Sequence, residues 1–226
     1  MPQYFLPTHV FVCRRGDAYV FLDLRRDDYT MVDGDSAAAL TAAIGGIEPL
    51  PEHASKALDE LLQVGLLTTD AVVGSAIVAS QVVSATDSLV DTEALPGAEV
   101  RLGHVWRFAM AYMKAFWRLR FTQLEKTVRR LERRKQRAGL SFSDLHRARD
   151  LTATFQKIRL HFPVRYVCLT DSLALLEFLA MYGIFPDWVF GVKLEPWAAH
   201  CWVQKDDVLF NEVADEAGSY SPVMSV

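Results

Sequence analysis

The sequence has few of the residues that build disulfides, metal sites and membrane spans. Only three cysteines occur among 226 residues, and their spacing matches no metal-ligand motif. No run approaches about 18 uninterrupted apolar residues, and the N-terminus lacks the basic leader, apolar core and cleavage site of a secretory signal. We therefore expect a reduced, cytoplasmic protein with no bound metal and no membrane partner.

The chain has a small net charge, but its basic and acidic side chains are strongly segregated along the sequence. The net charge is −4, yet residues 101–150 carry 14 basic and only 4 acidic side chains. A basic cluster at Arg129–Arg137 could neutralise the phosphates of a nucleic acid. No nucleic-acid motif or aromatic stacking platform accompanies it, so we favour a solvated face or an acidic partner and expect no nucleic-acid partner.

The first 70 residues predict a small module of three strands followed by two helices. The β-prone runs are separated by charged turns, and the helical segments place apolar residues on one face. The runs are Phe11–Cys13, Tyr19–Leu22 and Tyr29–Val32, and the helices begin near Asp35 or Ser36 and at Pro51-Glu52. Residues 71–98 have no aromatic side chain and predict a linker.

A second domain is predicted over residues 99–226. It opens with a helix that runs to Gly139, in which apolar residues recur every three or four positions, and a further helix passes through Leu151 and Phe155. The apolar positions of the first helix are Trp106, Met110, Met113, Phe116, Trp117, Phe121, Leu124, Val128 and Leu131. Strand-like runs follow near the C-terminus, so the chain is predicted to be α+β.

Cys168 directly precedes a run, Leu169–Tyr182, that is apolar on nearly every side and predicts a buried helix ended by Gly183. A lone cysteine is most often a small buried hydrophobe. At a helix N-terminus, however, the macrodipole and the free amides favour a thiolate. Its position therefore favours Cys168 as a nucleophile.

Three antiparallel strands, at residues 188–194, 199–204 and 208–213, are predicted after this helix. A three-residue turn at 205–207 would place His200 opposite Glu212, whereas a two-residue turn would place Asn211 beside it. Cys201 should point to the opposite face from His200. The candidate catalytic set is therefore Cys168, His200 and either Glu212 or Asn211.

The N-terminal module resembles the PqqD-like recognition domain, a winged-helix-like fold that takes up a leader peptide as an added strand. The resemblance rests on the strand end Tyr29–Gly34 and the helix end Leu61–Leu67. It implies a leader-binding surface, for which the candidate residues are Tyr29, Met31, Leu58, Leu61 and Leu62. The alternative is that the three leucines are simply core residues.

The whole chain resembles the B protein of lasso peptide biosynthesis, in which a PqqD-like domain is fused to a papain/transglutaminase-like α+β cysteine peptidase. The matching segments are Cys168–Leu176, Gly183-Ile184, Phe190–Val192, Pro196–Val203 and Asn211-Glu212. The family often has alanine at the position of Cys201 and aspartate at that of Glu212.

The resemblance implies a hydrolase that removes the leader of a ribosomally made precursor peptide, with a Cys168-His200-Glu212 triad and no cofactor of its own. A partner cyclase would then use ATP to close the macrolactam ring, and the basic helix could be its docking face. Two alternatives remain: acyl transfer to an amine, as in transglutaminases, or a noncatalytic scaffold that delivers the precursor.

Overall fold

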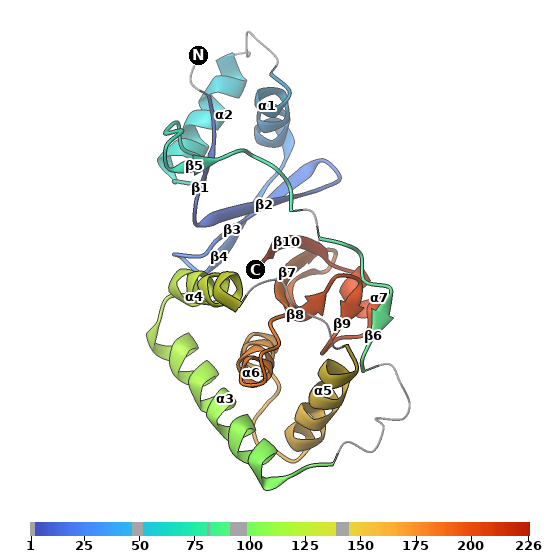
Figure 1. The fold of residues 1–226 in the computed structure, drawn as a ribbon. Coiled ribbons are helices and arrows are strands. Elements are labelled where there is room, and N and C mark those ends of the chain that lie inside the picture. Colours follow the sequence, from blue (N-terminus) through green and yellow to red (C-terminus); the bar gives the residue numbers. More distant parts are fainter. Residues whose placement is uncertain (1–2, 47–51, 81, 91–98, 139–144) are drawn as a thin grey trace. The chain divides into compact units, whose positions relative to one another are not determined.

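The computed structural model describes residues 3–46, 52–80, 82–90, 99–138 and 145–226 (Figure 1). The chain forms two compact units. Unit 1 comprises residues 1–81 and 221–224, and unit 2 comprises residues 82–220 and 225–226. The fold is α+β, as the sequence predicts: a small antiparallel sheet with helices is followed by a larger region of helices and sheet.

Unit 1 contains an antiparallel sheet of three strands, β2 (Val10–Arg15), β3 (Ala18–Asp23) and β4 (Asp28–Val32), in the order β2-β3-β4. These are the three predicted strands. Both hairpin turns use left-handed backbone, at Gly16 and Asp27, which tight antiparallel connections require. Because β3 is central, β2 and β4 are the edge strands of this sheet.

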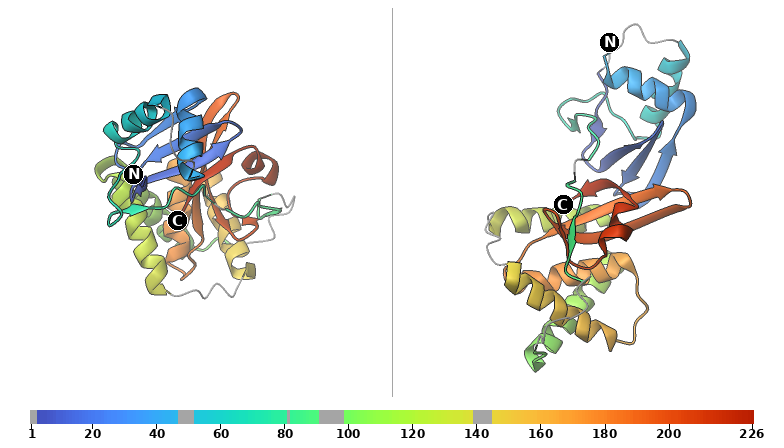
Figure 2. Two further views of the ribbon diagram at one scale, coloured as in Figure 1. Left: turned by 90° about the horizontal axis from the view of Figure 1, so that it is seen from above. Right: turned by 90° about the vertical axis from the view of Figure 1, so that its right-hand side faces the viewer.

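Two helices, α1 (Gly34–Ile44) and α2 (Glu52–Gln63), pack on one face of this sheet (Figure 2). Pro51, predicted to open α2, lies outside the described residues. The core includes Phe21, Leu40 and Leu58, which have no exposed surface. Two short strands, β1 (Leu6–Pro7) and β5 (Gly74–Ser75), pair antiparallel beside it.

A five-stranded sheet of order β10-β7-β8-β9-β6 forms the second sheet region. Its long strands are β7 (Asp187–Leu194) and β8 (Trp197–Lys205); the others are β6 (Asp87–Ser88), β9 (Val208–Leu209) and β10 (Ser221–Ser225), with a short helix α7 (Ala214–Gly218) before β10. The segment predicted as a linker thus supplies β5 and β6, and its residues 91–98 lie outside the described ones.

Helix α6 (Cys168–Ala180) is the central helix of unit 2, in contact with α3 (Leu102–Phe121), α5 (Leu145–Leu160) and β8 (Figure 1). Gly183 ends the turn after it at φ +78°, as predicted. The prediction of one helix through to Gly139 is wrong, because Thr122 adopts extended backbone and a new helix, α4 (Leu124–Ala138), begins. Among the described residues, no helix is both long and apolar enough to cross a membrane.

One buried carboxylate connects these helices. Glu177 of α6 has no exposed surface and forms ion pairs with Lys114 Nζ at 2.8 Å and Arg134 Nη1 at 3.0 Å, as well as with Arg118. A buried charge is tolerated only where it is paired and hydrogen-bonded. Glu177 therefore fixes α3 and α4 against α6.

The apolar stripe predicted on α3 is not the face that packs in unit 2. The buried side chains are Phe108, Ala111, Tyr112, Ala115 and Arg118. The predicted stripe residues Trp106, Met110, Met113, Phe116, Trp117 and Phe121 are instead 38% to 67% exposed. The predicted helical spacing is confirmed. Helix α3 carries two apolar faces, and α6 covers only the other one.

Candidate active site

Cys168 is the first residue of α6, after the extended N-cap residue Val167. Asp171 holds this helix start: its Oδ2 accepts the backbone N–H of Val167 at 2.9 Å, and its own N–H donates to the Val167 carbonyl at 2.9 Å. Tyr112 donates to Asp171 Oδ1 at 2.7 Å, and Arg159 contacts the same oxygen. Asp171 was not among the residues predicted from the sequence. An acidic residue in the first turn of a predicted helix is the feature that could have identified it.

His200 lies on β8 and is held by a carboxylate and by aromatic rings. Its Nε2 is 2.6 Å from Glu212 Oε2, and the two side chains are 13% and 16% exposed. The Tyr220 ring centroid is 5.2 Å from that of His200, and Trp202 stacks at 6.0 Å. The imidazole is therefore fixed in orientation beside an acceptor that suits its protonated form.

The backbone register explains why Glu212 rather than Asn211 reaches His200. Gln204 pairs with Leu209 and Lys205 with Val208, so the turn has two residues. Continued pairing at this register would have placed Val213 opposite His200 and Asn211 diagonally across from it on the same face, where this turn predicts the polar neighbour of His200. Strand β9 ends at Leu209, however, and the chain leaves the ladder after Phe210, so the predicted strand to Val213 is wrong beyond that point.

Asn211 has a structural role. Its Oδ1 accepts the backbone N–H of Val203 at 2.7 Å, and its Nδ2 donates to Ser172 Oγ at 2.9 Å. Ser172, one helical turn after Cys168, donates in turn to the carbonyl oxygen of Cys201 at 3.1 Å. Asn211 and Ser172 thus connect α6 to β8 just behind the Cys168 side chain.

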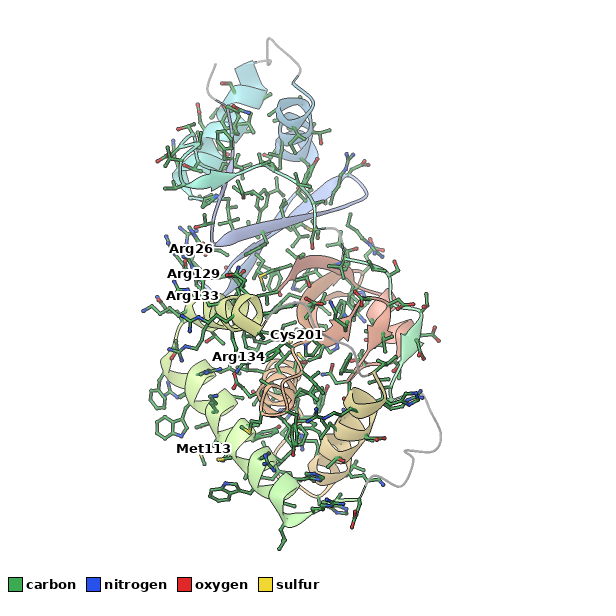
Figure 3. All side chains as sticks on the ribbon, viewed as in Figure 1. Arg26, Met113, Arg129, Arg133, Arg134 and Cys201 are labelled. Carbon is green, nitrogen blue, oxygen red and sulfur yellow. The ribbon has the colours of Figure 1, made fainter. Side chains whose placement is uncertain are left out.

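Cys168 receives hydrogen bonds from two neighbouring residues of β8, His200 and Cys201, and these lower its pKa to about 4 although burial opposes the shift. The Cys201 side chain is the largest of these influences. The expectation that Cys201 faces away from the site therefore needs correction: Cys201 is buried against α6 (Figure 3) and contacts the same sulfur as His200.

The pKa values of the three side chains favour a thiolate–imidazolium pair beside a carboxylate. Burial alone would lower the pKa of His200, but the hydrogen bonds to Cys168 and Glu212 outweigh it and raise the pKa to about 9. Burial would raise the pKa of Glu212, yet its hydrogen bonds to His200 and to the Val213 N–H lower it overall. By contrast, burial raises the pKa of Cys201 well above its ordinary value.

The five residues predicted to bind a leader peptide occupy different environments. Tyr29 and Met31 lie on the edge strand β4, where Met31 is exposed. Leu58 and Leu61 belong to the core of unit 1, and Leu62 packs against that core while partly exposed. Leu58 has no exposed surface and Leu61 is only 7% exposed, so these two side chains offer little or no surface to a peptide.

Among the described residues, no group of three or more His, Cys, Asp or Glu side chains is placed to hold a metal ion. Cys168, His200 and Glu212 have the composition of a thiol–imidazole–carboxylate site.

Comparisons with known proteins assign the chain to a family. Residues 109–225, which include Cys168, His200 and Glu212, match the Transglutaminase-like superfamily. Comparisons with curated proteins and with solved structures gave no match. Because the matched segment covers more than half of the 226 residues, the chain belongs to the transglutaminase-like superfamily.

Proposed function

We propose that this protein is a cysteine peptidase that cleaves the leader from a ribosomally made precursor peptide, of the lasso peptide kind. The observation that carries the proposal is the contact chain from Cys168 through His200 to Glu212. A low-pKa thiol at a helix start, a base within hydrogen-bond reach and a carboxylate behind the base are the parts of a nucleophilic thiol site.

In the proposed mechanism, the Cys168 thiolate attacks the carbonyl carbon of the bond that joins leader to core. The backbone N–H of Cys168, in the first turn of α6, helps to bind the developing oxyanion. The His200 imidazolium gives its proton to the leaving amine, which leaves a thioester. Neutral His200 then takes a proton from water, the hydroxide attacks the thioester, and the Cys168 thiolate is released.

Glu212 and Cys201 position and stabilise the two reacting side chains, His200 and Cys168. Glu212, 2.6 Å from His200 Nε2, holds the imidazole and stabilises its protonated form. The Cys201 thiol, hydrogen-bonded to Cys168, stabilises the thiolate that each turnover regenerates. Cys201 is not itself the nucleophile, because its burial disfavours the thiolate form.

We propose that unit 1 is a PqqD-like domain that binds the leader along the edge strand β4. An edge strand offers unpaired N–H and C=O groups to an extended peptide, and side chains beside it give specificity. Tyr29 and Met31 on β4 are the side chains that we assign to this surface. The freed core would pass to a partner cyclase that uses ATP to close the ring.

Cleavage is tested with the purified full chain and the precursor peptide encoded beside its gene, with masses recorded over time. We expect two fragments whose masses together exceed that of the precursor by one water; transfer to an amine would give a different mass. Cys168→Ala should bind the precursor without cutting it, and Cys13→Ala, at a buried thiol of unit 1, should cut normally. Cleavage by Cys168→Ala would refute the proposal.

Leader binding is tested separately. Met31→Asp should weaken the affinity for an isolated leader peptide at least tenfold, because a charge replaces an exposed apolar side chain at the proposed edge. Val72→Asp, at the most exposed valine, serves as the matched control. An unchanged affinity in Met31→Asp would reject this placement while leaving the peptidase proposal intact.

A further inference from the structure

Helix α3 carries a large exposed apolar face that no described part of the chain covers. Trp106, Met110, Met113 and Trp117 repeat at helical spacing along it, and Phe116 and Phe121 widen the stripe. Met113 is labelled in Figure 3. The rings are ordered against one another: Trp117 stacks on Phe121 at 4.7 Å, and its Nε1 donates to Met113 Sδ at 3.1 Å. We call these six residues the α3 apolar stripe.

Helix α4, the next helix along the chain, carries exposed charge. Its exposed residues Lys126, Arg130, Arg133 and Arg137 also repeat at helical spacing, so they form a basic stripe on one side of α4. Residues 102–121 of α3 contain no acidic side chain. Two consecutive helices thus present an exposed aromatic face and then an exposed cationic face.

We propose that the α3 apolar stripe and the α4 basic stripe dock unit 2 on an anionic membrane surface, with α3 lying in the plane of the interface. Interfacial helices combine a Trp/Phe/Leu face with Lys and Arg, and stable attachment requires two signals such as an apolar face and a basic patch. The chain carries both signals in adjacent helices. Crossing the bilayer is not involved, since no described helix is suited to span it.

The chemistry of the stripe suits a membrane interface. Aromatic side chains bury about 150–250 Å² each when fully covered, so the four half-exposed rings of the stripe alone offer on the order of 400–500 Å² of apolar surface. An interfacial helix needs only to insert its apolar side chains into the head-group boundary.

A second copy of the chain fits the surface less well. Pairing two α3 helices would bring Arg107 and Arg120 of each copy close to those of the other, and α3 has no acidic side chain to compensate. The charge is instead complementary to anionic lipid. The sequence predicts no membrane partner because it contains no apolar run long enough to span a bilayer. A helix that lies in the plane of the interface needs no such run.

The test is flotation of the full chain with vesicles of phosphatidylcholine containing about one third phosphatidylglycerol, at about 50 mM and about 500 mM salt. We expect binding at low salt, a blue shift of the tryptophan emission, and loss of binding at high salt or with pure phosphatidylcholine. Trp117→Asp and, as a second apolar variant, Met113→Asp should each weaken binding at least tenfold. Leu160→Asp, at an apolar residue of α5 that is even more exposed than Trp117 and Met113, is the matched control.

Charge is tested with Arg133→Glu, for which we expect at least a fivefold loss because each basic residue near an anionic surface contributes about that factor. Lys56→Glu, on α2, is its control. Absence of flotation at low salt, or binding that Trp117→Asp leaves unchanged in a folded protein, would overturn the proposal. A dimer in light scattering that Trp117→Asp converts to a monomer would overturn it too, in favour of a second copy.

Discussion

Replacing Cys201 with alanine isolates the contribution of one thiol to the reactivity of another. Cys201 donates a hydrogen bond to Cys168, whose pKa is lowered to about 4. A hydrogen bond to a charged group contributes about 1.5–3 kcal/mol, and one pKa unit corresponds to about 1.4 kcal/mol. Cys201→Ala should therefore raise the pKa of Cys168 by about one to two units.

The assay is the rate of alkylation of Cys168 by iodoacetamide across pH, followed by mass spectrometry. Only Cys168 should react, because Cys201 is buried and burial raises the pKa of Cys13 to about 11. Near pH 5 the alanine variant should react about two- to tenfold more slowly than the natural protein, and the rates should converge above about pH 8.

Cys201→Ser separates the hydrogen bond from packing. Serine keeps a donor at nearly the same position, so the midpoint of the alkylation profile should stay close to that of the natural protein. A general loosening of the site would move both variants together. If Cys201→Ala leaves the midpoint unchanged in a folded protein, Cys201 does not stabilise the Cys168 thiolate and the reasoning fails.

Three further changes test the surroundings. The pKa of His200 is raised to about 9. The stability that its protonated form contributes is therefore fully present below the unfolded pKa of about 6.5 and is lost as pH rises through about 9. The free energies of unfolding of the natural protein and of His200→Ala, measured in urea, should converge there. Gly191→Ala would place a Cβ 2.8 Å from the Trp202 ring and should cost about 1–3 kcal/mol in unfolding free energy, which an unchanged midpoint would contradict. Glu177→Leu leaves buried Arg118 without its carboxylate and should cost about 3–5 kcal/mol, and undiminished thermal stability would disprove that role.

The strands of unit 1 and the position of Cys168 could be predicted because local signals decide them. The three strands end at polar turns, and the left-handed Gly16 lies within one of them. Helix α6 is apolar on nearly every side, so only a buried central position can satisfy it, and Gly183 marks its end. Its first residue, Cys168, follows from those bounds.

The third member of the candidate triad could not be derived in the same way. The sequence left Glu212 and Asn211 open because the choice depended on the length of one turn. The observed two-residue turn points to Asn211 only if the strand continues. It ends at Leu209, so the identity of the residue beside His200 is decided by where pairing stops, which side-chain alternation does not encode.

Cys201 illustrates a second limit of strand alternation. Neighbouring residues on a strand point to opposite faces, and from this we expected Cys201 to be remote from the residue that His200 serves. The helix start, however, packs beside β8 so that both neighbours hydrogen-bond to Cys168. Alternation assigns faces correctly but says nothing about a third element that lies across the strand.

Apolar periodicity along α3 predicts a helix with an apolar face, but it does not show what packs against that face. Phe108, Ala111 and Tyr112 face the interior of unit 2, while Trp106, Met113 and Trp117 carry the same spacing on the outside. Only one set can pack against α6. Exposing apolar surface to water costs about 25 cal/mol per Å². Covering the outer residues with an apolar environment is therefore favourable. In our proposal, the basic stripe of α4 makes an anionic membrane surface the favoured cover.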